Sequence, residues 1–152
     1  KTQVIEWTPR YLEYQWIIQS ELKNWLDTEY IKDERAKCLI LVSPTRWGKT
    51  EWARHLKPYN HIYCRGNFNL DKWRDDAELL ILDDIPWDSI PQKKSLLTQM
   101  GESDITDKYR SKRVIHVVMP AIVLLNECPD FKDEKDYWNE NSTTVILNNK
   151  LY

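Results

Sequence analysis

A short apolar run that leads into a Gly-Lys-Thr loop and then a helical pattern restricts the fold more than any other part of this sequence. Residues 38–42 read CLILV, a continuous apolar run typical of a strand buried on both faces of a sheet. Residues 43–50 read SPTRWGKT, and residues 51–56 read EWARHL, which has a helical pattern. Strand, loop and helix in this order are the context that a phosphate-binding loop requires. The sequence therefore predicts an α/β P-loop fold with a mainly parallel central sheet flanked by helices.

The loop predicts a nucleotide site with a magnesium ion. In such loops backbone N–H groups surround the β-phosphate, the lysine reaches the β- and γ-phosphates, and the hydroxyl of the last residue ligates Mg²⁺. Lys49 and Thr50 fill these two positions, and Gly48 lets the backbone pass close to the phosphate. The residues expected to bind the nucleotide are Ser43, Pro44, Thr45, Arg46, Trp47, Gly48, Lys49 and Thr50.

Two positions of this loop depart from the usual pattern. Ser43 stands where glycine is usual, which removes conformational freedom. If that loss matters, nucleotide binding is weakened and Ser43→Gly should tighten it. The large ring of Trp47 either covers the nucleotide or packs against the neighbouring helix, and packing is the favoured interpretation.

A second apolar run ends in two carboxylates. Residues 76–84 read DAELLILDD, which predicts a buried strand that carries Asp83 and Asp84 to the carboxyl edge of the sheet, where ligands of open α/β sheets bind. We expect Asp83 to hold Mg²⁺ together with Thr50, and Asp84 to orient and polarise the attacking water. The alternative is that the pair caps a turn before Ile85-Pro86.

A third apolar run repeats the plan with an amide at its end. Residues 117–125 read VVMPAIVLL and are predicted to form one strand that runs into Asn126. The Asn126 amide could contact the γ-phosphate or the attacking water, or it could simply occupy a turn. Lys49, Asp84 and Asn126 are therefore the predicted catalytic residues.

A basic segment interrupts an otherwise slightly acidic chain. The formal net charge is −2, so any contact with nucleic acid needs a local patch. Residues 107–113 read DKYRSKR and precede the strand-like run 114–118, which together predict a basic hairpin. Its predicted contacts to single-stranded DNA are Lys108, Tyr109, Arg110, Lys112, Arg113 and His116. The alternative is an ordinary solvated charged turn.

The N-terminal region has a helical pattern. Thr8-Pro9 could open a helix from about residue 9 to 29, whose apolar stripe contains Tyr11, Tyr14, Ile18, Leu22 and Trp25. This stripe either packs on its own domain or forms a contact between subunits. We therefore divide the chain into an N-terminal helical oligomerisation segment, residues 1–35, and an ATPase domain, residues 36–152. Residues 143–147 predict a last strand.

Composition narrows the classes of protein that remain. A chain of 152 residues is the size of one ordinary domain, and no apolar run reaches the length of a membrane span. Three widely spaced cysteines favour a reducing intracellular setting, with Cys38 and Cys64 filling the core rather than holding zinc. The first residues lack a signal-peptide pattern and an initiator methionine, so we expect a soluble fragment of a longer protein.

These motifs together carry a family resemblance. The stretches SPTRWGKTEWARHL, ELLILDDI, MGESDITDKYRSKRVI and MPAIVLLNECP resemble Walker A, Walker B, B′ and motif C of the superfamily 3 helicase domain. They are most similar to those of the replication initiator (Rep) proteins of circular single-stranded DNA viruses, in the geminivirus and genomovirus branch. The resemblance covers about residues 38–128, and the preceding helix is similar to the oligomerisation segment of those proteins.

The resemblance implies a fold, an activity and a set of partners. It implies an AAA+-like ATPase that uses ATP and Mg²⁺, forms a homo-oligomer, usually a hexameric ring, moves on single-stranded DNA and unwinds duplex in the 3′ to 5′ sense. It places Lys108, Lys112 and His116 at basic positions of the ring's pore, with His116 the least secure contact because a neutral imidazole binds phosphate weakly. It also implies a host-nuclear location and no membrane partner.

The sequence departs from the family in two further ways. No arginine follows Asn126, so an arginine finger across subunits must come from earlier positions such as Arg65, Arg74, Arg110 or Arg113. No His-x-His motif is present, so the nicking-endonuclease domain of the initiators is expected to be missing and this fragment should not cut or join DNA. The alternatives to a helicase are a non-hydrolysing DNA-binding or oligomerisation module and a small P-loop kinase.

Overall fold

The computed structural model describes residues 7–107 and 112–152, and its centre is a five-stranded sheet in the order β2-β3-β6-β1-β7. Every neighbouring pair in this sheet is parallel. The predicted α/β class with a mainly parallel sheet is confirmed. The strands of the sheet are β1 (Cys38–Val42), β2 (Ile62–Arg65), β3 (Leu80–Asp83), β6 (Ala121–Leu125) and β7 (Ser142–Ile146).

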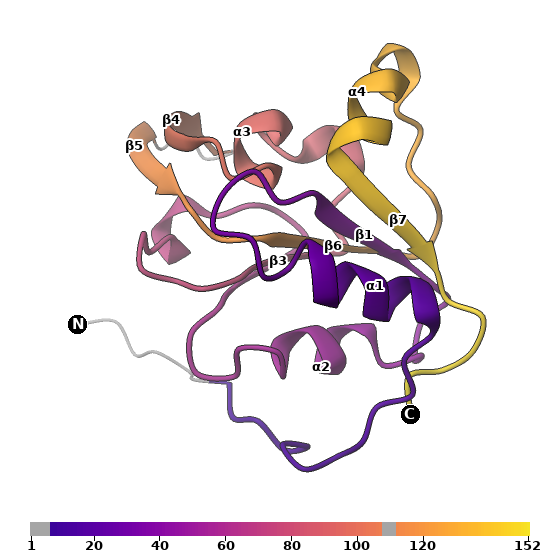
Figure 1. Ribbon diagram of the computed structural model, residues 1–152. Helices are drawn as coiled ribbons and strands as arrows, with labels where there is room; N and C mark the ends of the chain where they lie inside the picture. Colours follow the sequence, from indigo (N-terminus) through magenta and orange to yellow (C-terminus); the bar gives the residue numbers. More distant parts are fainter. Residues whose placement is uncertain (1–6, 108–111) are drawn as a thin grey trace.

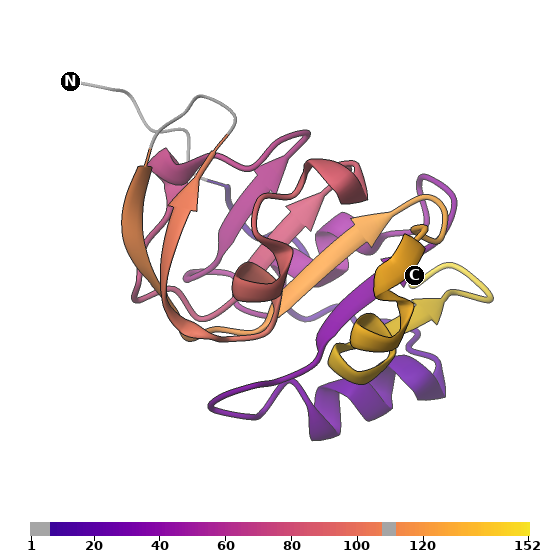
Figure 2. The same cartoon turned by 90° about the horizontal axis from the view of Figure 1, so that it is seen from above.

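Helices cover both faces of this sheet, as Figures 1 and 2 show. On one face lie α1 (Ser20–Thr28) and α2 (Lys49–Arg54), and on the other lie α3 (Lys93–Leu97), α4 (Lys135–Asn141) and an antiparallel hairpin of β4 (Gly101–Thr106) and β5 (Lys112–Val117). Within the described ranges, three short 3₁₀ helices complete the elements: η1 (Leu70–Lys72), η2 (Trp87–Ser89) and η3 (Lys132–Glu134).

The side chains of β1 illustrate how the two faces are filled. Leu39 and Leu41 join the core beneath α1 and α2, whereas Cys38 and Ile40 join the core on the opposite face. All five residues of β1 are buried, which explains why its sequence is apolar without alternation. The cysteine prediction is confirmed at Cys38 and Cys64, which are fully buried, while Cys128 is exposed.

The parallel register brings the ends of three strands together. Val42 pairs with Leu125, and Asp83 pairs with Leu124, so β1, β3 and β6 end at the same edge. The residues that follow these strands therefore meet outside one edge of the sheet. The last strand, predicted at residues 143–147, is confirmed as β7.

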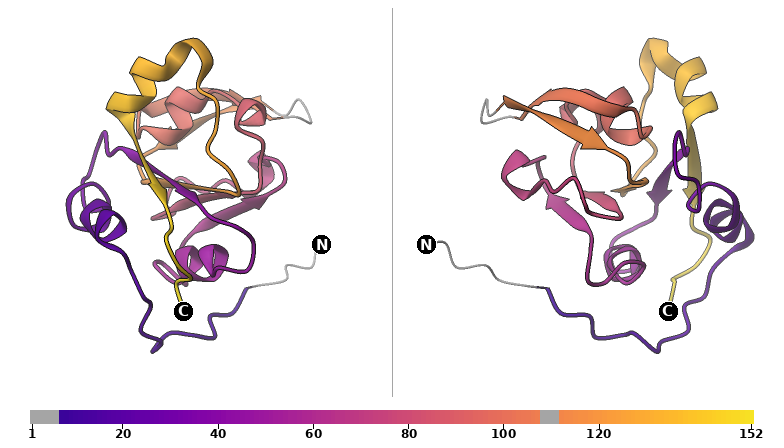
Figure 3. Two further views of the ribbon diagram at one scale, coloured as in Figure 1. Left: turned by 90° about the vertical axis from the view of Figure 1, so that its right-hand side faces the viewer. Right: turned by 60° about the vertical axis from the view of Figure 1, so that its left-hand side comes forward.

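The predicted helix over residues 9–29 is wrong for its first half. α1 begins only at Ser20. Residues 7–19 form an irregular strap that passes α2 on its side away from the sheet before it reaches α1 (Figure 3). Long-range contacts fix this N-terminal strap. The backbone N–H groups of Arg10 and Tyr11 donate to His55 Nε2 at 3.2 and 3.0 Å, and Ile17 N donates to Leu151 O at 2.8 Å. The Ile17 N–H cannot also serve a helix, where it would bond to the carbonyl four residues earlier.

The strand predicted over residues 117–125 is also corrected. β5 ends at Val117 and β6 begins at Ala121, with Pro120 between them. Proline has no N–H to donate to a ladder, so the chain leaves the hairpin before Pro120 and enters the central sheet after it. The predicted hairpin itself is present, with Asp104 paired to Val114.

Candidate functional site

The loop of residues 43–50 takes a left-handed backbone conformation at two positions, and neither is Ser43. Arg46 has φ of 64° and Gly48 has φ of 93°. Ser43 is absent from the residues with positive φ in the described ranges, so the freedom that glycine would add is not used there. The Ser43 N–H donates to Leu125 O at 3.2 Å, which ties the loop to β6.

Lys49 is held across the loop by a set of oxygen acceptors. Its side chain is buried, and Nζ donates to Ser43 O at 2.8 Å, to Ser43 Oγ at 2.9 Å and to Pro44 O at 3.2 Å. Nζ also lies 3.3 Å from Asn126 Oδ1 at the end of β6. Burial lowers the pKa of Lys49, and the charges of Asp83 and Asp84 oppose that shift. Ser43 and Pro44 therefore position the lysine.

Thr50 and Asp83 meet directly. The Thr50 hydroxyl donates to Asp83 Oδ2 at 2.7 Å, so the last residue of the loop and the last residue of β3 form one unit. Asp83 is therefore turned toward the loop rather than used to cap the following turn. The neighbouring Asp84 is exposed and has φ of 56°, a conformation that aspartate tolerates in turns.

Tyr63 on β2 joins this pair, although nothing in the sequence singled it out. Its hydroxyl donates to the same Asp83 Oδ2 at 2.5 Å, and the guanidinium of Arg54 lies 3.9 Å from the centre of its ring. Burial, together with the hydrogen bond to Asp83 and the charge of that carboxylate, raises the pKa of Tyr63. Only the pairing of β2 beside β3 brings the tyrosine here, so no local pattern could have revealed it.

These groups surround one open cleft of about 400 Å³ at the carboxyl edge of the sheet. It is lined by Thr45, Arg46, Trp47, Gly48, Lys49, Thr50, Glu51, Tyr63, Arg65, Asp83, Asp84 and Asn126. The structure therefore brings together all the predicted catalytic and metal-binding residues. Trp47 is partly buried against the core beneath α1 and α2 and also lines the cleft, so its ring packs and borders the site at once.

The four candidate arginines lie in different places. Arg65 lines the cleft. Arg74 donates to Asn60 Oδ1 at 2.8 Å and to His61 O at 3.3 Å, and Arg113 donates to Trp73 O at 3.2 Å. Arg110 lies outside the described residues. Within one chain, Arg65 is therefore the cation from this group that reaches the cleft.

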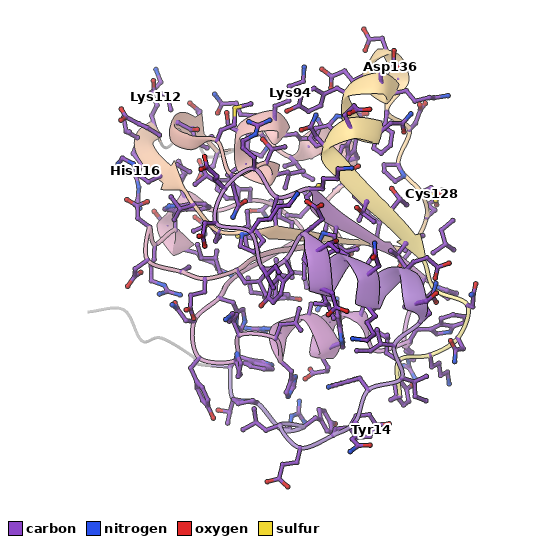
Figure 4. The ribbon with its side chains drawn as sticks, viewed as in Figure 1. Tyr14, Lys94, Lys112, His116, Cys128 and Asp136 are labelled. Carbon is purple, nitrogen blue, oxygen red and sulfur yellow. The ribbon has the colours of Figure 1, made fainter. Side chains whose placement is uncertain are left out.

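The basic hairpin is separate from the cleft. Lys112, Arg113 and His116 on β5 are exposed, and Lys112 and His116 project from the molecule on the side opposite Cys128 in Figure 4. The backbone of His116 donates to Asp75 Oδ1 at 3.0 Å, which ties β5 to the loop after η1. The other predicted DNA contacts, Lys108, Tyr109 and Arg110, lie outside the described residues.

Comparison with known proteins identifies the kind of chain that carries this site. The sequence is 33% identical over 137 residues to the replication-associated protein of Bean yellow dwarf virus, 35% over 136 residues to that of Sugarcane streak virus, and 34% over 135 residues to that of Chloris striate mosaic virus. These alignments cover 84% to 86% of this chain. The chain belongs to the Rep-like proteins of circular single-stranded DNA viruses.

The Rep-like chain spans only part of its relatives. It covers 40%, 37% and 36% of the three replication-associated proteins, respectively. No family model matches the sequence. Among the described residues, no helix combines the length and apolar character needed to cross a bilayer, and no cluster of His, Cys, Asp and Glu side chains could hold a metal by itself.

Proposed function

We propose that this Rep-like chain is the ATP-hydrolysing motor of a rolling-circle replication initiator, and that hydrolysis drives movement on single-stranded DNA and unwinding of duplex. The observation that carries the proposal is the convergence of Lys49, Thr50, Asp83, Asp84 and Asn126 on one cleft from three separate strand ends. Transfer of a phosphoryl group depends mainly on positioning and on electrostatic stabilisation, which such an arrangement can supply.

The pair formed by Thr50 and Asp83 suits a magnesium ion. Their oxygens lie 2.7 Å apart at the cleft, and Mg²⁺ prefers hydroxyl, carboxylate and water oxygens. When bound, Mg²⁺ would neutralise charge on the β- and γ-phosphate oxygens. Tyr63 contributes by holding the Asp83 carboxylate from the side of β2.

The remaining residues act on the phosphates and on water. Lys49 can exchange its bonds to Ser43 and Pro44 for bonds to phosphate oxygens, because its ammonium group lies within the loop already. Asp84, exposed in the cleft, would orient the attacking water and accept its proton. Asn126 can hydrogen-bond the same water or the γ-phosphate, and Arg65 adds a cation within the same chain.

Steady-state ATP turnover with and without single-stranded DNA tests the proposal. Lys49→Ala and Asp84→Asn should each lower kcat by about 100-fold or more. Lys135→Ala and Asp136→Asn make the same changes of charge at exposed positions of α4 and should leave kcat unchanged. Wild-type turnover in Lys49→Ala or Asp84→Asn would contradict the assignment.

Two other outcomes would favour the alternatives. ATP binding without turnover would favour a non-hydrolysing module that binds DNA or assembles subunits. Transfer of phosphate to a small acceptor would favour a P-loop kinase. The same proposal includes four further points. They are a homo-hexameric ring, contact of the hairpin with single-stranded DNA, the use of residues 1–35 for assembly, and a nuclear location. The support for this proposal is the relation to replication-associated proteins.

A further inference from the structure

A second pocket, of about 200 Å³, adjoins the cleft on the α2 side of the sheet. It is lined by Tyr11, Tyr14, Trp16, Gly48, Glu51 and Tyr152. Gly48 and Glu51 line the cleft as well, so the pocket and the cleft meet around the start of α2. The pocket is therefore continuous with the place where the proposed function puts the phosphates.

One wall of this aromatic pocket is the N-terminal strap. The rings of Tyr14 and Trp16 lie 4.9 Å apart at 68°, and Tyr11 lies 6.2 Å from Trp16, so the three rings form an edge-to-face cluster. His55 on the far side of the strap fixes it, because Nε2 accepts the N–H groups of Arg10 and Tyr11. Tyr11 and Tyr14 remain 43% and 42% exposed.

Tyr152 also lines the pocket, and it is anchored on the loop. Its hydroxyl donates to Arg46 O at 2.8 Å, and a Cβ added at Gly48 would lie 3.1 Å from its Cδ1 atom. The ring therefore lies directly against the loop, yet the residue is 50% exposed. Half-exposed aromatic faces that line the pocket provide surfaces on which a flat ring can stack.

Glu51 lies where the pocket and the cleft join, and it has an unused acceptor. Its Oε1 atom is buried and has no hydrogen-bond partner among the described residues. His55 Nδ1 lies 3.8 Å away, and that atom donates to Glu51 O instead. A buried carboxylate oxygen without a donor is costly. The Glu51 side chain as a whole is 33% exposed, so a turn of its carboxylate toward the junction would let it accept from a hydroxyl there.

We propose that the aromatic pocket receives the base of the nucleotide whose phosphates bind the loop 43–50, with Glu51 accepting a hydrogen bond from the sugar hydroxyls. This inference rests on the proposed function, since it extends the same ligand from the cleft into the pocket. The base stacks against the strap and Tyr152, while the sugar lies at the junction that Gly48 and Glu51 share. Stacking recognises any flat base, so the pocket selects for a nucleoside rather than for one particular base.

Calorimetric titration with two probes, ADP and inorganic pyrophosphate, each with Mg²⁺, tests the inference. Tyr14→Ala and Tyr152→Ala should each weaken ADP binding by about tenfold and leave pyrophosphate binding unchanged. Tyr14→Phe keeps the ring and should bind ADP as the wild type does. Tyr59→Ala removes a tyrosine that lies outside the pocket and is 79% exposed, and it should leave the affinity for both ligands unchanged. In Glu51→Ala, the preference for ADP over deoxy-ADP should disappear.

A fluorescence measurement on the wild type, with Trp16→Phe used only to define the signal of Trp16, protects the test against misfolded variants. ADP, but not pyrophosphate, should quench the part of the tryptophan fluorescence that is lost in Trp16→Phe. Wild-type ADP affinity in both alanine variants, or equal quenching by the two probes, would overturn the inference. The proposed function would still stand if Lys49→Ala abolished binding of both probes, and it would fail together with the inference if the wild type bound neither.

Discussion

Asp83 Oδ2 accepts hydrogen bonds from two hydroxyl groups that arrive from different elements, Thr50 at the start of α2 and Tyr63 on β2. Two donors on one oxygen restrict both the position and the rotation of the carboxylate. The Thr50 contact belongs to the loop, whereas the Tyr63 contact belongs to the neighbouring strand. The proposed metal ligand is thus oriented by a residue that need not touch the metal or the nucleotide.

Tyr63→Phe should raise the Mg²⁺ concentration needed for half-maximal ATP turnover by about tenfold, because loss of a partner that orients a ligand typically costs this much metal affinity. Turnover at saturating Mg²⁺ should fall much less. Titration of kcat against Mg²⁺ measures the effect. Tyr59→Phe removes an exposed hydroxyl elsewhere and serves as the control. An unchanged Mg²⁺ requirement would show that Tyr63 only packs.

Ser43→Gly should not tighten nucleotide binding, a question that the sequence pattern alone leaves open. Ser43 is 2% exposed, its Oγ accepts from Lys49 at 2.9 Å and donates to Pro44 O at 2.8 Å, and its backbone does not need glycine. Loss of these bonds should lower the free energy of unfolding by about 1 kcal/mol. Ser43→Ala loses only these side-chain bonds. The free energy of unfolding of Ser43→Gly should be lower than that of Ser43→Ala by roughly a further 0.5–1 kcal/mol, because glycine loses more conformational freedom on folding. Chemical denaturation can measure this difference. Tighter ADP binding in Ser43→Gly would contradict this reasoning.

At the scale of elements, β1, β3, β6 and β7 of the central sheet were predictable, whereas β2 and the strap were not. β1, β3 and β6 are short apolar runs that end in polar residues, and this pattern is local. The residues of the strap have helical spacing, but their N–H groups bind His55 and Leu151, which are distant in sequence. A local pattern contains no information about such partners. For the same reason the motifs indicated Lys49, Asp83 and Asn126 but left Tyr63 unnoticed.

The apolar stripe of the predicted helix is also divided between two roles. Leu22 and Trp25 lie on α1 and are fully buried against the chain's own sheet. Tyr11 and Tyr14 lie on the strap and remain partly exposed. Leu22 and Trp25 therefore pack on the chain's own domain, whereas Tyr11 and Tyr14 face the pocket beside the loop.

The β4–β5 hairpin can be tested by its effect on single-stranded DNA binding. Each phosphate contact that is lost should reduce the slope of log affinity against log salt concentration by about 0.7. Lys112→Ala should lower both the affinity and this slope, because Lys112 is exposed on β5. Lys135→Ala makes the same change of net charge on α4 and should leave the slope unchanged. Equal slopes for wild type and Lys112→Ala would remove Lys112 from the proposed contacts with DNA.

At the scale of the whole molecule, stability should depend on pH through His61. Its Nε2 accepts from Arg54 Nε at 3.0 Å, and its Nδ1 donates to Lys57 O at 2.8 Å. Burial, followed by the charges of Arg54 and Arg74, lowers the pKa of His61 below 6.5, against the opposing effect of the Lys57 carbonyl. The unfolded chain therefore binds this proton more readily than the folded chain does.

The free energy of unfolding should accordingly be highest above about pH 6.5 and fall as the pH drops through that value. Urea denaturation between about pH 7.5 and pH 5.5 measures the fall. It should be smaller in His61→Gln, which cannot take up the proton. His116→Gln removes an exposed imidazole and should retain the fall. Identical pH profiles for wild type and His61→Gln would contradict the assignment.

Of the three cysteines, only one should have a reactive thiol while the chain is folded. Burial raises the pKa of Cys38 to about 12 and also raises the pKa of Cys64, so neither thiol should react with a maleimide while the protein is folded. Cys128 is exposed two residues after Asn126. One adduct should form on the folded protein and three after unfolding, as mass spectrometry can count. A fluorophore attached there would report on the edge of the sheet that carries the proposed nucleotide site, with no substitution in the chain.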